Sequence, residues 1–455
     1  MKNQLNARLL LCLIAVASMV ACGGAEESTN DANSGNMAPT EPTEPTEPTA
    51  GCPAGTAEVA EFCALEGRIT TDLTLTANNQ YILSGPVFIG DGTAETVLTI
   101  EPGTTIYGIK DPGSPGTLII DRGSKIEAVG TADAPIVFTS DQLEGQKDRG
   151  DWGGIIINGY APINGCDAAP CSAEGEGSAG TYGGDNPEDN SGTLKYVRVE
   201  YAGTLFSEDN ELNGIAFQGV GSGTVVDYIQ VHMNKDDGIE FFGGTVSAKH
   251  VVITGAGDDS IDWTDGWVGN IQYAIVKQYE DDGDNGIEAD NNKANNDFLP
   301  RSNPTLANLT FIGNENTDIG MLIREGTGVT IANSVVSGFG DACLVLDNEA
   351  TFANSCDADA SLITLSNLVL NCETQIEEPD PAEFTAACTA ESIFSRAGSN
   401  VTTDETVLEN YMPASDSMLL SPADAIELAA WFDNTAFIGA VGDEDWTAGW
   451  TIGLE

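Results

Sequence analysis

Short runs of alternating apolar and polar residues fill the middle of the chain, separated by Gly, Asn and Asp, and no helical period runs through them. Seven runs share one pattern, in which a polar residue is followed by β-branched or aromatic positions. They begin at Lys195, Asp227, Lys249, Gln272, Asn308, Asn333 and Asn367. The closest starts are 22 and 23 residues apart. This period indicates a solenoid with one strand run in each coil, and the longer intervals indicate loops.

Alternation along the runs predicts which side chains face the core. The positions expected inside are Val197, Val199, Ile229, Val231, Val251, Ile253, Val276, Ile312 and Val335, whereas Val252, Ile275, Phe311 and Val336 are expected outside. The first position of each run is expected to form an inward polar ladder. In it, Asn308, Asn333 and Asn367 bond to one another and to turn backbone, so that their buried polar groups are satisfied. Asp227 and Lys249 in the same column are expected to neutralise one another.

Several longer stretches resemble a known group of proteins. TVLTIEPGTTIYG from Thr96, GTLIIDRGSKIEAVGTADAPIVFTS from Gly116 and DWGGIII from Asp151 resemble the opening coils of bacterial exported proteins of the pectin-lyase-like class. The stretches GTYGG, DNSGTLKYVRVEYAG and DWTAGWTIGL resemble a subgroup of surface lipoproteins. The resemblance implies an all-β fold, a right-handed parallel β-helix built as a single-stranded solenoid with disulfide-pinned loops. We expect the β-helix over residues 52–375 and a C-terminal segment, 376–455, that packs on it.

This resemblance implies less about activity than about fold. The class contains lyases, hydrolases, adhesins and inert scaffolds, so function has to be argued from sites.

The N-terminus predicts export and lipidation. MKNQLNARLLLCLIAVASMVAC places two cations before an apolar run that is too short to span a bilayer, which is typical of a secretory signal over residues 1–21. Its end, MVAC, resembles a lipobox, which implies cleavage before Cys22 and lipid attachment there. Gly23 after this Cys favours, by analogy, an outer-membrane lipoprotein at the cell surface or facing the periplasm. The alternative is an ordinary signal peptide with an incidental Cys.

The next residues, 22–51, contain TEPTEPTEPT, a Pro-rich acidic run with almost no apolar side chains. Such a run cannot bury a core, and we expect it to act as a semi-extended tether between the membrane and the folded part.

Eight cysteines remain for the folded part, because two of the ten lie in the signal and the lipobox. An even number in an exported chain favours disulfides, and pairing between sequence neighbours is the simplest of the 105 possible connectivities. The expected pairs are Cys52 with Cys63, Cys166 with Cys171, Cys343 with Cys356, and Cys372 with Cys388. A zinc site is less favoured, since the chain has no CxxC and only two histidines.

Charge excludes one class of partner. The formal net charge is −54, and nucleic acid binding needs a basic face. Cations are the natural partners of such a surface. The alternative is an acidic surface that only maintains solubility.

Three acidic stretches recur at nearly the coil period: NKDDGIEFFGG from Asn234, GDDSIDWTDG from Gly257 and DDGDNGIEAD from Asp281. With the isoleucine of each stretch inside, Glu240, Asp262 and Glu288 project outward as one column. Carboxylates about 4.8 Å apart repel by roughly 3 kcal/mol at an effective dielectric near 20. A hard divalent cation, Ca²⁺, would offset this repulsion with oxygen ligands from the column and the preceding turns. The expected turn ligands are Asp236, Asp237, Asp258, Asp259, Asp282 and Asp284, with Asp281 beside them. The alternative is a solvated acidic rim, relieved by screening or raised pKa values.

A second column faces outward from the other strand set. Tyr196, Tyr228, His250 and Tyr273 are expected to stack, with Arg198, Gln230, Glu200, His232 and Lys277 beside them. Aromatic faces flanked by polar groups suit a sugar ring, and a groove along a β-helix suits a linear polysaccharide. The alternative is that the C-terminal segment covers this face.

Catalysis would need a base beside the cation site. Lys277, His232 and Arg198 are the candidates for a lyase, and the acidic stretches contain too many carboxylates to single out the pair that a hydrolase needs. We therefore favour a non-catalytic binding or structural role. The alternative is a calcium-dependent polysaccharide lyase or glycoside hydrolase.

Replacing Cys22 with Ser should release the protein from the membrane fraction, because the tether and the acidic domain carry no other hydrophobic anchor. Fractionation followed by immunoblotting measures this, with the unmodified chain as the control. A Cys22→Ser protein that stays in the membrane fraction would contradict lipid anchoring at this residue.

Overall fold

The computed structural model describes residues 51–207, 210–381, 384–396, 401–403, 408–420 and 428–455. Pro48–Glu455 forms one compact unit. Cys22 and nearly all of the expected tether lie outside the described residues. Among the described residues, no helix is long and apolar enough to cross a membrane.

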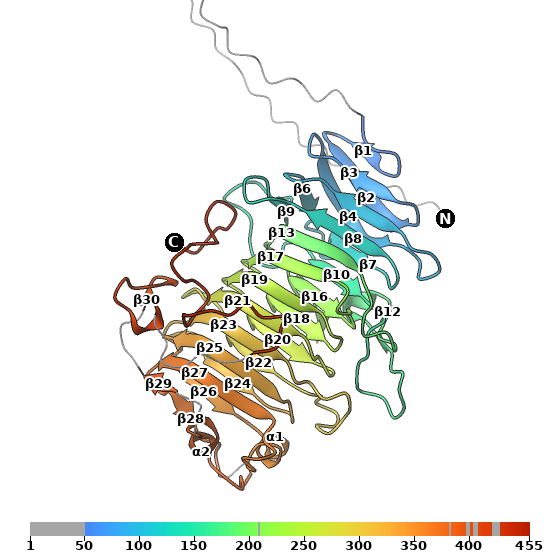
Figure 1. Cartoon of the computed structure of the whole chain (residues 1–455). Coiled ribbons are helices and arrows are strands. Elements are labelled where there is room, and N and C mark those ends of the chain that lie inside the picture. The colour runs from blue at the N-terminus through green and yellow to red at the C-terminus, as the bar shows by residue number, and fades with distance from the viewer. Residues whose placement is uncertain (1–50, 208–209, 382–383, 397–400, 404–407, 421–427) are drawn as a thin grey trace, which may run out of the picture. The chain divides into compact units, whose positions relative to one another are not determined.

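The strands form a parallel β-helix whose coils stack strand on strand (Figure 1). Along one face, each strand pairs in parallel with its equivalent in the next coil. These strands are β7 (Thr117–Ile120), β10 (Ile155–Asn158), β16 (Ile215–Gln218), β18 (Ile239–Phe242), β20 (Ile261–Thr264), β22 (Ile287–Ala289), β24 (Ile319–Ile323), β26 (Ala342–Leu346) and β28 (Ile376–Glu377). The all-β parallel fold expected from the sequence is therefore confirmed.

The first coils carry separate strands on their other two faces. One ladder joins β3 (Leu73–Leu75), β5 (Val97–Ile100) and β8 (Lys125–Val129), and the other joins the start of β4 (Gln80–Ile89) to β6 (Thr105–Gly108) and β9 (Ile136–Ser140). The N-terminal end is the antiparallel pair of β1 (Ala57–Val59) with β2 (Phe62–Ile69). Short hairpins elsewhere are β11 (Ala173–Glu174) with β12 (Thr181–Tyr182), β14 (Leu205–Ser207) with β15 (Asn210–Glu211), and β30 (Leu408–Glu409) with β31 (Met412–Pro413).

From β13 onward, a single bent strand in each coil runs across both of these faces. The two halves of β13 (Gly192–Glu200) pair with β8 and β9. The later members are β17 (Val225–His232), β19 (Ser247–Thr254), β21 (Asn270–Lys277), β23 (Thr305–Ile312), β25 (Val329–Ser337), β27 (Ile363–Asn371) and β29 (Thr402–Thr403). One residue in each long strand has a positive φ between 50° and 63°: Tyr196, Tyr228, His250, Tyr273, Asn308, Asn333 and Asn367. This left-handed residue makes the corner between two faces.

The position of the corner residue shows that the expected register of the later runs is wrong by one residue. Ala274 pairs with Leu309, and the flanking Gln272 pairs with Ala307, so Asn308 aligns with Tyr273 and not with Gln272. The asparagine column is therefore the continuation of the aromatic column. The expectation that Ile312 and Val335 face inward is wrong: Phe311 and Val336 belong to the central core instead. The physical reason is that Asn308 and Asn333 are themselves corner residues, whereas the earlier runs begin one residue before the corner, so the alternation of the later runs was counted from the wrong residue.

Polar pairing along this corner also differs in part. Asn367 donates to Asn333 Oδ1 at 3.0 Å, so one bond of the expected ladder is present. The inward placement of the ladder is wrong, because these asparagines continue the outward aromatic column. Asn308 instead donates to the carbonyl of Phe437 at 3.1 Å, in the C-terminal part of the chain. Asp227 is bound by Lys195 at 2.9 Å rather than by Lys249.

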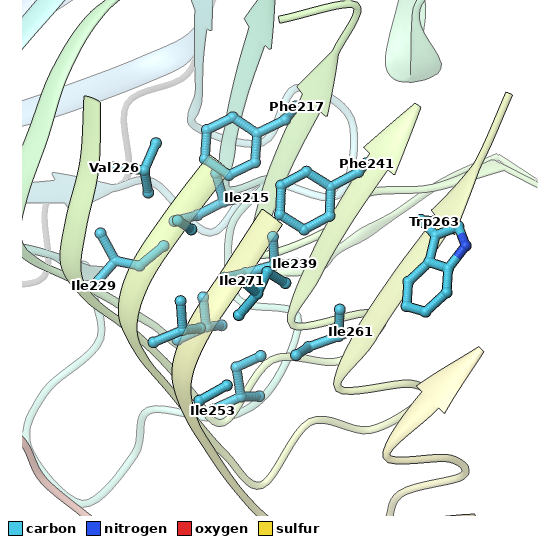
Figure 2. Close-up of a cluster of buried hydrophobic side chains, with 14 of the residues drawn as sticks. Ile215, Phe217, Val226, Ile229, Ile239, Phe241, Ile253, Ile261, Trp263 and Ile271 are labelled. Carbon is cyan, nitrogen blue, oxygen red and sulfur yellow. The ribbon is translucent and has the colours of Figure 1, made fainter. Parts of the chain in front are cut away.

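Stacked apolar side chains fill the interior (Figure 2). Ile239 and Ile261 occupy equivalent positions in successive coils, and Phe217, Phe241 and Trp263 form a second column. The rings of Phe217 and Phe241 stack with centroids 5.3 Å apart. Burial of these columns along the whole solenoid supplies the main driving force for folding.

The C-terminal strap, defined here as residues 428–455, covers the outer side of the long strands. Gln230 and the backbone of Ile452 exchange two hydrogen bonds of 2.6 and 3.0 Å. Ala440, Val441, Trp450 and Leu454 pack on Val252 and Ile275, and Ile438 packs on Val335 and Val369. The packing of a C-terminal segment on the β-helix is therefore present. The ladder itself extends to β29, beyond the expected boundary at residue 375.

The described part of the chain contains four disulfides, and two of the expected pairs are correct, Cys52–Cys63 and Cys166–Cys171. The other two are wrong: the structure pairs Cys343 with Cys372 and Cys356 with Cys388. Stacking brings a residue closest to the next coil, so the partner lies 29 or 32 residues away rather than nearby in sequence. The second bridge joins the segments around α1 (Glu349–Ala353) and α2 (Ala390–Phe394).

Replacing Phe241 with Ala should destabilise the protein by about 3–5 kcal/mol, because the lost ring leaves a cavity between Phe217 and Trp267. The urea unfolding midpoint measures the loss. Val268→Ala is the matched control, since Val268 is 40% exposed and should change stability by less than about 0.5 kcal/mol. Equal losses in the two variants would contradict the core position of Phe241.

Candidate cation-binding site

Three carboxylates form one column on consecutive strands. Glu240 on β18 pairs with Asp262 on β20, which pairs with Glu288 on β22. The preceding isoleucines occupy the core, so the side chains of the column point outward as the sequence predicted. Ala216 comes before the column and Leu322 follows it, which limits the acidic column to three coils.

The turn before each strand adds two more columns. Asp237 Oδ1 accepts a hydrogen bond of 3.1 Å from the backbone N–H of Asp259. Asp259 Oδ1 accepts one of 2.8 Å from the backbone N–H of Asn285 in the next coil. Beside them, the backbone N–H of Asp284 donates to the carbonyl of Asp258 at 3.1 Å. The turns therefore stack in register, and their carboxylates lie at the same edge as the outward column.

The structure brings eight of the predicted residues together. They fall into four overlapping groups, in each of which one oxygen per residue lies within 4.8 Å of the others: Asp236, Asp237 and Asp258; Asp237, Glu240 and Asp262; Asp258, Asp259 and Asp284; and Asp259, Asp262 and Glu288. The groups share members, so they form one continuous patch, called here the carboxylate patch. Its oxygens are close enough to surround one or more cations.

Asp281 and Asp282 do not join the patch. Asp281 accepts hydrogen bonds of 2.9 and 3.1 Å from Arg149, and Asp282 lies 3.2 Å from Lys235 Nζ. Both carboxylates are neutralised by cations from other coils, which the spacing of the acidic stretches did not reveal.

Other residues complete the patch. Asn213 donates to Glu240 Oε2 at 2.7 Å and to Glu176 Oε2 at 3.2 Å. At the other end, Arg324 forms ion pairs with Glu288 and with Asp290, the latter at 2.9 Å. These four residues were missed from the sequence. Glu176 comes from a loop far from the acidic stretches. Asp290 ends the third acidic stretch and follows the outward Glu288 by two residues, a spacing that could have indicated it. Asn213 and Arg324 have no motif, and only the register of the coils could have found them.

Burial is the largest cause of the raised pKa values in the carboxylate patch. It raises the pKa of Asp237, Glu240, Asp259 and Asp262 well above the usual range, and neighbouring carboxylates raise it further. Burial likewise raises the pKa of Asp236 and Glu288 to about 7. Without a cation, the carboxyl groups of the patch therefore keep their protons to a higher pH than free carboxyl groups do.

Several buried oxygens of the patch have no hydrogen-bond partner among the described residues. They are Oδ1 of Asp262, Asn213 and Asn285. Asn213 and Asn285 are only 1% and 3% exposed. An unpartnered buried polar atom is costly, so these oxygens would gain from a ligand that accepts lone pairs, as a cation does.

The aromatic column is present, but its geometry differs from a sugar-stacking platform. Tyr196 and Tyr228 stack with centroids 4.4 Å apart, Tyr228 and His250 at 4.0 Å, and His250 and Tyr273 at 4.9 Å. The ring faces therefore contact one another, and only the ring edges point away from the β-helix. Trp446 of the C-terminal strap lies across the edge of His250, with ring planes at 68°. Ligand binding by this column stays a prediction.

The three candidate bases do not lie beside the carboxylate patch. Arg198 donates to the carbonyl of Trp450 at 2.8 Å, and Lys277 to that of Leu454 at 3.0 Å. His232 is buried against Thr254, and its burial lowers its pKa to about 4. All three lie on the long strands and contact or adjoin the C-terminal strap, so their expected place at the acidic rim is wrong.

A family model described as a pectate-lyase like beta helix domain matches residues 67–451. The match therefore spans nearly all of the β-helix and most of the C-terminal strap. No curated protein and no solved structure matches the chain significantly.

In the absence of divalent cations, the protein should lose stability as the pH rises. The folded-state pKa is about 7 for Asp236 and Glu288 and is also raised for Asp237, Glu240, Asp259 and Asp262, against about 4 for carboxyl groups when unfolded. Between these pKa values the folded state therefore binds more protons than the unfolded state. The stability that this proton binding contributes is fully present below about pH 4 and is lost as the pH rises through about 7. Thermal melts in chelator from pH 5 to pH 8 should show a falling Tm, by about 2–4 °C for each kcal/mol lost.

Glu240→Gln should flatten this pH dependence, because it removes one titrating group from the patch. Glu315→Gln, at an exposed position outside the patch, is the matched control and should leave the slope unchanged. A Tm that rises from pH 5 to pH 8 in chelator would contradict the raised pKa values.

Proposed function

This chain belongs to the pectate-lyase-like β-helix family, and we propose that it is a surface-anchored lipoprotein whose β-helix binds Ca²⁺ at the carboxylate patch. The family supports a binding or polysaccharide-related role for the β-helix. The finer proposal depends on the patch itself. Its anchoring part depends on the N-terminal sequence that ends at Cys22.

One observation carries the calcium proposal: eight acidic residues contribute oxygens within 4.8 Å of one another in four overlapping groups. Ca²⁺ takes six to eight oxygen ligands at about 2.3–2.6 Å and tolerates irregular geometry. The patch offers the carboxylate oxygens of these eight residues, including the buried and unpartnered Oδ1 of Asp262. Zn²⁺ is less suited, since the patch contains no nitrogen or sulfur ligand among the described residues. Mg²⁺ is less suited because it demands near-octahedral geometry.

Protonation is the competing way to relieve the patch, and the two states exclude each other at the same oxygens. Arg324 neutralises only the end of the column at Glu288 and Asp290. Asp237, Glu240 and Asp262 lie further along the patch. We propose Ca²⁺ at that inner part, where Asp237 and Glu240 are buried and the described cationic side chains form no ion pair.

A non-catalytic role is favoured over the calcium-dependent lyase or hydrolase. Among the described residues, Arg324 is the basic side chain that forms an ion pair with a carboxylate of the patch. Its ion pairs with Glu288 and Asp290 fix the position of its guanidinium group. Lys277 and Arg198, which a lyase could have used, bind the C-terminal strap. The proposed role is therefore that of a rigid surface scaffold stabilised by calcium.

Added Ca²⁺ should raise the melting temperature at pH 7.5, and a chelator should lower it, because the ion binds the folded state alone. A hundredfold excess over the dissociation constant corresponds to about 2.7 kcal/mol. Mg²⁺ should have a smaller effect at the same concentration. Differential scanning calorimetry and calcium titration calorimetry of the purified protein measure both.

Asp262→Asn tests the centre of the patch, where it should reduce the calcium-dependent rise in Tm. Asp282→Asn removes the same charge from the neighbouring edge but outside the four groups, and should keep the rise. If Asp262→Asn raises stability in chelator and the unmodified protein shows no calcium effect, the patch is only a crowded acidic surface and the proposal fails.

A further inference from the structure

A second site lies on another face of the β-helix, between the aromatic column and the C-terminal strap. It is a pocket of about 470 Å³, a volume typical of small-molecule sites. Tyr228, His250 and Tyr273 form its inner wall, and Phe437 and Trp446 of the C-terminal strap line its outer part. The strands β17, β19 and β21 thus position one wall, and a segment about 200 residues later in the sequence supplies the other.

The backbone conformation of the inner wall does not by itself call for aromatic residues. All seven corner residues have positive φ, a conformation that Asn tolerates best among residues with a side chain. The three corners farther along the solenoid are asparagines, whereas the three that line the pocket are Tyr, His and Tyr. A corner therefore works with Asn in this same β-helix. Three of the four aromatic corners line the pocket, and the fourth, Tyr196, meets Trp450 of the C-terminal strap edge-to-face. The aromatic corners thus lie where the strap supplies aromatic partners, which favours a role in contacts at this surface over a role in the turn.

The edges of the stacked rings determine which polar groups the inner wall presents to the pocket. Because the rings stack face to face, their edges are what the pocket can meet. The hydroxyl of Tyr273 is hydrogen-bonded to Asp433, and His250 Nδ1 lies 2.8 Å from Asp227 Oδ1. Hydroxyl and imidazole groups on one side, with Phe437 and Trp446 on the other, combine hydrogen bonding with apolar contact. Sugars present the same combination of hydroxyls and apolar C–H surfaces.

Charge limits which sugars fit. The carboxylates of Asp433, Asp443 and Glu444 line the same pocket, and all three residues are exposed. Carboxylates accept hydrogen bonds from hydroxyl groups, but they repel the carboxylate of a uronic acid. The pocket therefore favours an uncharged sugar.

A neighbouring pocket of about 490 Å³ extends the site across the same coils. Trp431, Lys249 and the hydroxyl-bearing side chains of Thr224 and Ser247 line it. The two pockets meet at the ion pair between Lys249 and Asp433, whose atoms are 2.8 Å apart. Two adjacent pockets of this size suit a chain of sugars better than a single one.

We propose that these two pockets together bind a linear, uncharged oligosaccharide, with Tyr228, His250 and Tyr273 contacting one end and Trp431 the other. The site lies on different strands from the carboxylate patch, so its function does not depend on calcium. It also gives the surface scaffold a defined ligand class.

The test is titration calorimetry of the mature full-length protein with neutral hexasaccharides and an anionic counterpart. The probes are the hexamers of β-1,4-glucan, β-1,3-glucan, β-1,4-mannan, β-1,4-xylan and α-1,4-glucan, and hexagalacturonate. At least one neutral hexamer should bind at least tenfold more tightly than hexagalacturonate, with equal affinity in CaCl₂ and in chelator. Calcium-independent binding keeps this result separate from the fate of the calcium proposal.

Tyr228→Asn and Tyr196→Asn form a matched pair of variants. Both make the same change at a corner of the same column, but only Tyr228 lines the pocket. Tyr228→Asn should weaken binding of the neutral hexamer at least tenfold and Tyr196→Asn by less than threefold, both measured well below the melting temperature of each variant. Trp431→Ala should weaken binding of the hexamer but leave binding of the corresponding disaccharide within threefold.

Three results would overturn the proposal. The first is that none of the five neutral hexamers binds to the folded protein. The second is that hexagalacturonate binds more tightly than every neutral probe. The third is that Tyr196→Asn and Tyr228→Asn weaken binding equally and in proportion to their loss of Tm, which would make the column purely structural.

Discussion

Parallel pairing between successive coils is the constraint on which the rest of this structure depends. It places each side chain about 4.8 Å from its equivalent in the next coil. Residues of similar chemistry at equivalent positions of successive coils therefore form a column. In the interior this repetition is favourable, as the columns of Ile239 with Ile261 and of Phe217 with Phe241 show. On the outside the same rule can bring together side chains that would otherwise avoid one another.

The two outward columns deal with this crowding in different ways. In the carboxylate patch, burial and mutual repulsion raise the pKa of Glu240 and Asp262, and Arg324 closes one end. In the aromatic column, the flat rings of Tyr228 and His250 pack face to face at 4.0 Å, so stacking itself is attractive. A β-helix thus concentrates one kind of chemistry on each edge, and this protein carries acidic chemistry on one edge and aromatic chemistry on another.

The sequence was sufficient wherever its two-residue alternation was unbroken. The IE, ID and IE pairs at 239–240, 261–262 and 287–288 predicted both the buried isoleucines and the outward column. The inward positions were wrong where a run had been aligned one residue out of register: Asn308 occupies the corner, as Tyr273 does, so the inward positions after it are Leu309 and Phe311. Contacts between coils could not be predicted either. The Cys343–Cys372 bridge, the Arg324 ion pairs and the approach of Glu176 to Asn213 all depend on loop lengths that no local pattern encodes.

The C-terminal strap has a consequence for how the molecule folds. Val252, Ile275, Val335 and Val369 are apolar side chains on the outer side of the long strands, and they pack on Leu419 and on apolar residues of 438–454. The strap lies far along the chain from most of the strands that it covers, so the ladder can form before the strap docks. A folding intermediate with a complete ladder and an undocked strap would expose a continuous apolar stripe. Such a species is prone to aggregate, so docking of the strap protects the folding chain as well as the folded one.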